Sequence, residues 1–397
     1  MKRICTALLA LLAASSVAMA VEEVPFHLFN RFRVGYDNNI YRVSDDHDPE
    51  ESLRLIEEVT ALLNLNFHNH TSFSIRYTPS LTWYEAREDD KVDVLHDLSA
   101  DFSHKISDTL TLNLGDSLRA GQLPELHSDD YVVREDDDNY YNSAIAALLY
   151  NVGPNTRIDL SGRFISLTYT DDGDAHKYDD YISPVGGLTV RQQLNSLAAA
   201  MADFRYQRLL YDKNPEGFDR DSTMIFAGVG YEQTLSSYFI GSLRGGVEQR
   251  WYDDDEFYDD QTQPYGELSL TFLPVADFRT TLAASYSIYE SDISNYMSQN
   301  RTYLSLSAAW EVTSRLGLYA SVIYSHNDYD ADYAKSDSEL KDGAEDTFAF
   351  STRAAFEFYR HNWLEVCYQF IKLDSDIPGR EEYDNHRVDL GWRIQIF

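Results

Sequence analysis

The segment 72–84 holds the feature that most limits what this chain can fold into, because its apolar residues recur at every second position. A period of two places one set of side chains on each face of a β-strand. One face then favours hydrocarbon, and the other, rich in serine and threonine, favours water. The apolar set of this segment is Phe73, Ile75, Tyr77, Pro79, Leu81 and Trp83. Similar alternation recurs from Val21 onward without helical periodicity, which predicts an all-β fold.

About 18 strands of this kind are predicted, most of them longer than the roughly five or six residues usual in soluble sheets. They reach the roughly 9–11 residues that a tilted strand needs to cross a bilayer. The predicted ranges are 26–41, 52–69, 72–87, 92–106, 108–120, 139–151, 156–170, 178–192, 195–211, 221–234, 237–252, 262–274, 278–290, 299–313, 316–328, 346–359, 363–374 and 383–397.

The connections between these strands alternate between short and long. Tight turns, such as those at 235–236 and 361–362, are separated by long acidic segments such as 135–138 and 328–346. This alternation indicates a single transmembrane antiparallel up-and-down β-barrel, with short periplasmic turns and long acidic extracellular loops. A soluble β-sandwich or propeller is the competing architecture. It would have shorter strands and no reason to alternate its loop lengths.

Residues 1–20 have the features of a Sec signal peptide. A short basic end is followed by an apolar stretch from Ala7 to Ala14 and by Ala18-Met19-Ala20, which predicts cleavage after Ala20. An uncleaved anchor helix is the alternative, but the apolar stretch is too short to span a membrane. Residues 21–397 then form the outer-membrane barrel, with no second domain and no N-terminal plug.

Charge and missing motifs exclude several function classes. The chain has 66 acidic against 33 basic residues, a formal charge of −33, so its field repels phosphate and argues against nucleic acid as a partner. Sequence motifs for nucleophilic, metal-hydrolase or phosphate-binding chemistry are missing. The protein is therefore predicted not to be an enzyme, and no cofactor is predicted.

Arginines within the predicted strands nearly all fall on the face opposite the apolar set, with Arg208 as the exception. Placing them inward avoids a cost of about 2–4 kcal/mol for an arginine at the midplane of the lipid face. Such a wall can form arginine–carboxylate ladders that stiffen the barrel, or it can set a transverse field across a water-filled pore. The predicted lumen-lining residues are Arg31, Arg33, Arg76, Arg119, Arg157, Arg163, Arg205, Arg244, Glu248, Arg250, Arg279 and Arg353.

The acidic loops allow two interpretations. Carboxylates such as Asp253, Asp254, Asp255 and Glu256 are candidate ligands for Ca²⁺ or Mg²⁺, which would link the loops to anionic lipopolysaccharide. They would also attract cations to the mouth of a pore. Alternatively, they form a solvated, repulsive surface that prevents aggregation.

The chain resembles the outer-membrane β-barrel porin families of Gram-negative bacteria. The resemblance is carried by the opening strand, Val34-Gly35-Tyr36-Asp37-Asn38-Asn39-Ile40-Tyr41, and by the final strand, which ends at Phe397. It implies that the last strand is recognised by the barrel-assembly machinery. The apolar residues of that strand are one position out of phase with Phe397, which a bulge or a frayed end would reconcile.

Together these features predict a channel in the outer membrane, surrounded by lipid and lipopolysaccharide. It would be a porin passing small hydrophilic solutes with mild cation preference, because a barrel of about 18 strands is too wide for side chains alone to fill. The alternative is a structural or exopolysaccharide-export-associated barrel with a plugged lumen.

Overall fold

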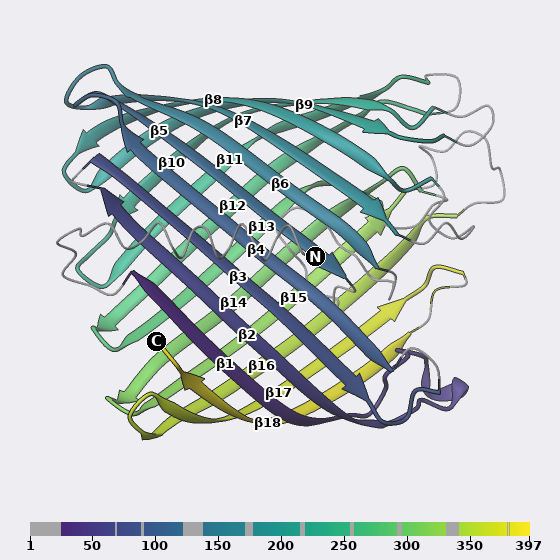
Figure 1. Cartoon of the computed structure of the whole chain (residues 1–397). Helices are drawn as coiled ribbons and strands as arrows, with labels where there is room; N and C mark the ends of the chain where they lie inside the picture. The colour runs from purple at the N-terminus through teal and green to yellow at the C-terminus, as the bar shows by residue number, and fades with distance from the viewer. Residues whose placement is uncertain are drawn as a thin grey trace, which may run out of the picture.

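Eighteen antiparallel strands form one closed sheet in the computed structural model (Figure 1). The structure describes residues 25–67, 70–88, 91–121, 138–170, 178–214, 219–254, 258–291, 296–330, 341–378, 380 and 382–397. Each strand pairs with its neighbours in the chain, and β1 pairs with β18. The predicted fold, an up-and-down barrel of about 18 strands, is confirmed. The predicted signal peptide, 1–20, lies outside the described residues.

The strands are long, and a single short 3-10 helix, η1, is found among the described residues. Their bounds are β1 Phe26–Asp37, η1 Asp45–His47, β2 Ser52–Phe67, β3 Thr71–Tyr84, β4 Val92–Lys105, β5 Leu110–Gly121, β6 Asn139–Asn151, β7 Thr156–Tyr169, β8 Tyr181–Asn195, β9 Ala198–Tyr211, β10 Ser222–Thr234, β11 Phe239–Tyr252, β12 Gln261–Val275, β13 Phe278–Glu290, β14 Ser298–Thr313, β15 Leu316–Tyr329, β16 Gly343–Tyr359, β17 Asn362–Ser375 and β18 Tyr383–Gln395. Within the described part of the chain, no helix has the length and apolar character required to cross a membrane.

The two faces of the wall follow directly from the alternation in the sequence. Residues opposite each other in an antiparallel pair share a face, so the strand register assigns every strand residue to one side. In β1, Phe32, Val34 and Tyr36 are exposed on the outside, while Asp37 is buried on the inside. Large apolar side chains remain exposed around the exterior, with Val229 at 69% and Leu243 at 58%. In an outer-membrane barrel this exterior contacts lipid.

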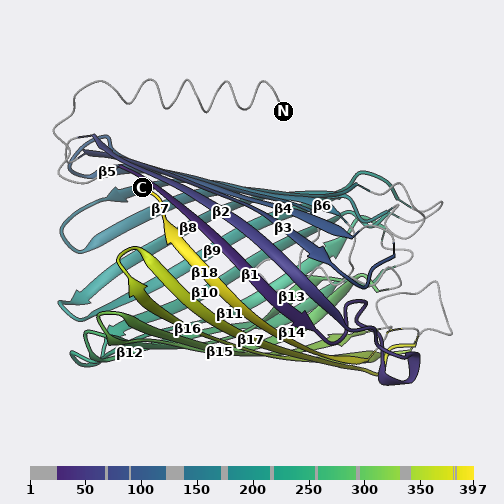
Figure 2. The same ribbon diagram turned by 60° about the horizontal axis from the view of Figure 1, so that its bottom comes forward.

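Short and long connections alternate between the two ends of the barrel (Figures 1 and 2). At one end, the turn end, β8 stops at Asn195 and β9 begins at Ala198. At the other, the loop end, β1 stops at Asp37 and β2 begins at Ser52. The start of β1 and the end of β18 both lie at the turn end (Figure 1). This arrangement places the turn end in the periplasm and the loop end outside the cell.

The C-terminal residues extend the contact that closes the barrel. The amide of Ile396 donates to the carbonyl of Leu28 (2.7 Å), while the amide of Leu28 donates to the carbonyl of Phe397 (3.2 Å). Two residues of the last strand thus oppose one residue of β1, which is the geometry of a β-bulge. The bulge explains why Phe397 is out of phase with the apolar residues that precede it.

Candidate functional site: the charged inner face

The inner face carries all twelve residues predicted to line the lumen. The strand register places each of them opposite the lipid-facing apolar set, and it places Arg208 on the outside. Their part in passing a solute stays a prediction. Within this common face the arginines differ in what they contact, and three groups can be distinguished.

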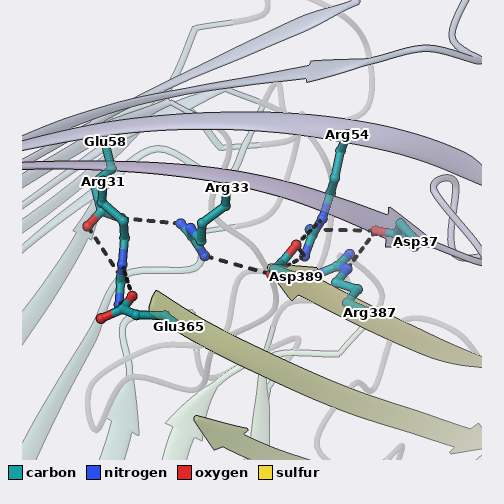
Figure 3. Close-up of polar contacts among 8 residues, drawn as sticks. All are labelled: Arg31, Arg33, Asp37, Arg54, Glu58, Glu365, Arg387 and Asp389. Atoms are coloured by element: carbon teal, nitrogen blue, oxygen red, sulfur yellow. Dashed lines mark hydrogen bonds and ion pairs between the residues drawn. The ribbon is translucent and has the colours of Figure 1, made fainter. Parts of the chain in front are cut away.

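The first group surrounds Glu365, whose side chain is fully buried. Arg31 Nε donates to Glu365 Oε2 (2.6 Å), and Arg393 Nε lies 3.3 Å from Glu365 Oε1. Arg31 also reaches Glu58 (3.4 Å) on the neighbouring strand β2. Because Arg31 lies on β1 and Glu365 on β17, this contact passes over β18 and ties together strands that share no ladder (Figure 3).

A second cluster lies nearer the loop end of the same seam. Arg54 donates to both carboxylate oxygens of Asp389, each at 2.9 Å, across the β1 strand that separates them. Arg387 Nε donates to Asp37 Oδ2 (2.7 Å), and Asn385 donates to the other oxygen of Asp37 (2.6 Å). All four charged side chains are at most 9% exposed. The seam that closes the barrel is therefore held by buried, hydrogen-bonded ion pairs (Figure 3).

Gly35 makes room for this arrangement. It lies directly opposite Asp389 in the register, and a Cβ added there would meet Asp389 Oδ1 at 1.9 Å. Only a residue without a side chain lets the carboxylate lie across β1 and reach Arg54. Sequence reasoning missed Arg54 as an inner-face residue, although its position between Leu53 and Leu55 gave the necessary signal.

The third group lines a cavity of 520 Å³ on the inner side of β6–β14. Arg205 is one of its lining residues and pairs with Asp203 (3.0 Å). Its guanidinium lies 4.3 Å from the ring centroid of Phe226 and 5.3 Å from that of Tyr265, distances typical of cation–π contacts. Next to Phe226 the backbones of β10 and β11 approach closely, since a Cβ at Gly246 would meet the carbonyl oxygen of Ala227 at 2.3 Å.

The cavity is lined by apolar and polar side chains together. Both kinds come from β6–β10, as Phe226 and Gln207 show, and from β11–β13, as Leu268 and Glu267 show. Apolar lining residues are Ile145, Ile165, Val185, Leu209, Met224 and Phe226, and polar ones include Glu248, Arg250, Glu267, Ser285 and Ser287. A cavity of this size has room for a small solute, and its charged and hydroxyl side chains suit one that is hydrophilic.

Beside this cavity, the wall itself is irregular between β12 and β13. Their pairing toward the loop end stops at Gly266 opposite Tyr286. Beyond it, Glu248 of β11 reaches past β12, accepting hydrogen bonds from the Ser287 hydroxyl (2.8 Å) and the Ile288 amide (3.0 Å). Continuing the register would set Pro264 opposite Ile288, and proline has no N–H for the ladder. The Glu248 side chain thus accepts the hydrogen bond of the Ile288 amide, which the β12–β13 backbone ladder does not pair.

Several predicted arginines have weaker contacts. Arg119 lies 3.4 Å from Asp97, with both side chains about 40% exposed. In three further pairs the interacting atoms are between 2.8 and 3.8 Å apart. These pairs are Arg157 with Asp159, Arg163 with Ser143, and Arg244 with Glu267. Of the twelve predicted residues, Arg76, Arg279 and Arg353 are exposed and make no side-chain hydrogen bond or ion pair within the described part of the chain.

Loop carboxylates gather at the outer end of β9–β11. Oxygen atoms of Asp219, Asp221 and Asp253 lie within 4.8 Å of one another. Arg208 Nη1 donates to Asp253 (2.7 Å), and this hydrogen bond holds the pKa of that carboxyl below its usual range. Burial raises the pKa of Asp221. The grouping is not the consecutive run that the sequence suggested, and binding of a divalent cation there stays a prediction.

Of the four carboxylates predicted to bind Ca²⁺ or Mg²⁺, two lie within the described residues. Asp253 belongs to the cluster above, and Asp254 accepts a hydrogen bond from the amide of Asp219 (3.4 Å). Asp255 and Glu256 lie outside the described residues.

A closed antiparallel barrel with a charged inner face and an apolar exterior defines the class of outer-membrane β-barrel proteins. A family model described as "Putative beta-barrel porin 2" matches residues 32–396, nearly the whole chain, and the protein belongs to this family. The resemblance noted in the sequence is thus confirmed, and the protein is a porin-like barrel of the outer membrane.

Solved structures show the same fold. The chain is similar to OpdO of Pseudomonas aeruginosa, with 11% identity, a TM-score of 0.50, and coverage of 94% of this chain and 98% of that one. It is similar to OccAB2 of Acinetobacter baumannii, with 9% identity, a TM-score of 0.50 and the same coverage. At such identity the similarity concerns the fold alone. No curated protein matches the chain.

Proposed function

We propose that the barrel is a passive channel for small hydrophilic solutes, with mild cation preference. The observation that carries the proposal is the 520 Å³ cavity on the polar inner face of a closed barrel. Membership of a porin family supports the same conclusion. No side chain of this site is proposed to act as a catalyst.

The pairing of charges on the inner face argues for weak selectivity. Two of the arginines that line the cavity have carboxylate partners: Arg205 pairs with Asp203 and Arg250 with Glu290 (2.9 Å). A paired wall offers a permeating ion little net field. The preference for cations would then come from the loop end, where carboxylates such as Asp46, Asp48 and Glu50 are exposed.

Conductance in planar lipid bilayers tests the proposal. The purified full-length barrel should give stepwise increases in current. Under a potassium chloride gradient, the sign of the reversal potential should show that potassium passes more readily than chloride. Folding is verified in parallel by the mobility shift that barrels show on gels when heated. Folded protein that stays silent in the bilayer would refute the channel and favour the plugged barrel. A reversal potential favouring chloride would contradict the cation preference alone.

The route to the membrane is part of the same proposal. We infer that residues 1–20 are removed after Ala20, so N-terminal sequencing of the mature protein should begin at Val21. The exposed C-terminal residue Phe397, 64% accessible beside β1, would be recognised by the barrel-assembly machinery. Deleting it should reduce the amount of assembled barrel in the outer membrane.

The acidic loops would contact lipopolysaccharide through divalent cations, and removing these cations with a chelator should disrupt the contact.

A further inference from the structure

Two carboxylates and one imidazole lie deep within the lipid-facing surface. Among outward-facing residues of the described strands, only Glu57, His96 and Asp116 have an acidic, imidazole or basic side chain and lie at least four residues from both ends of their strands. They belong to β2, β4 and β5, which lie close together in the wall. Each is flanked along its strand by outward apolar residues on both sides, as Glu57 is by Leu55 and Val59. They therefore interrupt the apolar band itself.

Each of these groups has one polar partner on an adjacent strand. His96 Nδ1 lies 2.8 Å from the Tyr77 hydroxyl, and the two rings stack with centroids 6.1 Å apart. Asn142 donates to Asp116 (2.8 Å). The third pair is Asn30, which donates to the carboxylate of Glu57. The pairs lie between β1 and β2, between β3 and β4, and between β5 and β6. Six of the eighteen strands therefore have a polar pair within the apolar band of the exterior.

One partner leaves each carboxylate incompletely satisfied. A carboxylate has about four lone-pair positions, and lipid tails offer no donor to the rest, so an ionisable group in the membrane indicates a functional contact. The other twelve strands, β7–β18, have no comparable group this deep on their outer face within the described residues. The exterior of β1–β6 thus differs from the remainder in needing a polar partner inside the membrane.

We propose that this face, the outer surface of β1–β6, binds a second copy of the same chain. It carries acceptors, Glu57 and Asp116, together with donors from Tyr77 and Asn30, so two such faces complement each other. Symmetric interfaces are built from self-complementary surfaces of this kind. Six strands about 4.8 Å apart, over an apolar band about 25 Å tall, present on the order of 700 Å². That is close to the roughly 800 Å² per partner of stable interfaces.

Cross-linking in outer-membrane fractions tests the interface in the full chain. Both native cysteines, Cys5 and Cys367, are replaced by alanine, and a single cysteine is introduced by Leu98→Cys on β4 or, as the control, by Leu243→Cys on β11. Both positions face outward. A bis-maleimide reagent should link Leu98→Cys into a species of two chains and leave Leu243→Cys as single chains. No linkage at Leu98→Cys, or linkage to a protein of different mass, would overturn the proposal.

A variant lacking the three groups separates association from folding. Glu57→Leu, His96→Leu and Asp116→Leu combined should abolish the multi-chain species in native mass spectrometry. The heat-dependent gel shift should be retained, because apolar side chains suit the lipid face. Arg208→Leu, which removes an outward charge near the loop end, is the matched control and should keep the association. Wild-type protein of single-chain mass, or a triple variant that still associates, would refute the interface.

Discussion

Asp37→Asn removes one carboxylate from the seam that closes the barrel without changing the size of the side chain. The Asp37 side chain is fully buried and Arg387 is 5% exposed. Arg54, 3.8 Å from Asp37, keeps its closer partner Asp389, so Arg387 is the cation that loses its carboxylate. Removing one partner of a buried pair costs about 3–5 kcal/mol, because the other charge stays buried without compensation. We expect a loss of that size in the free energy of unfolding.

Asp97→Asn is the matched control on the same inner face. Asp97 and Arg119 are 3.4 Å apart, and their side chains are 41% and 40% exposed. Water screens such a pair, so its loss should cost about 0–1 kcal/mol. The measurement is urea-induced unfolding in lipid vesicles, followed by tryptophan fluorescence. Equal losses for Asp37→Asn and Asp97→Asn would refute the conclusion that buried pairs at the β1–β18 seam stabilise closure.

Three further results are expected. Glu248→Ala leaves the Ile288 amide without its acceptor, so hydrogen exchange of that amide should accelerate while the paired amides of β13 stay protected; unchanged exchange would contradict the role assigned to Glu248. Arg208→Ala removes the donor that lowers the pKa of Asp253, so a carbon-detected carboxyl titration should show that pKa rising. In the native protein Asp253 is stabilising above its unfolded pKa, and the contribution is lost as pH falls through its lower folded pKa; an unaltered titration would refute this. Neutralising Asp46, Asp48, Glu50 and Glu51 together should reduce the cation preference in bilayers, and Arg353→Gln should increase it; no change in reversal potential for either variant would show that these charges do not set selectivity.

The sequence by itself determined the architecture and the face of each residue. A period of two decides which side chains share a side, and this placed Arg31 inward and Arg208 outward before any contact was known. Alternating connection lengths fixed the up-and-down order. Strand ends were less certain, since β16 begins at Gly343 where the pattern suggested 346. Ends depend on ladder hydrogen bonds that continue into polar loop residues, which the apolar pattern does not record.

Only the tertiary structure decided which charges meet. Arg54 and Asp389 are 335 positions apart in the chain, and they pair because β1 and β18 close the sheet in one particular register. Closure likewise brings Glu365 of β17 to Arg31 of β1. The period of a strand fixes the direction of a side chain, whereas register and curvature fix its neighbours. The alternation therefore predicted a charged inner wall, and the closed barrel determined where that wall is a buried ion-pair network.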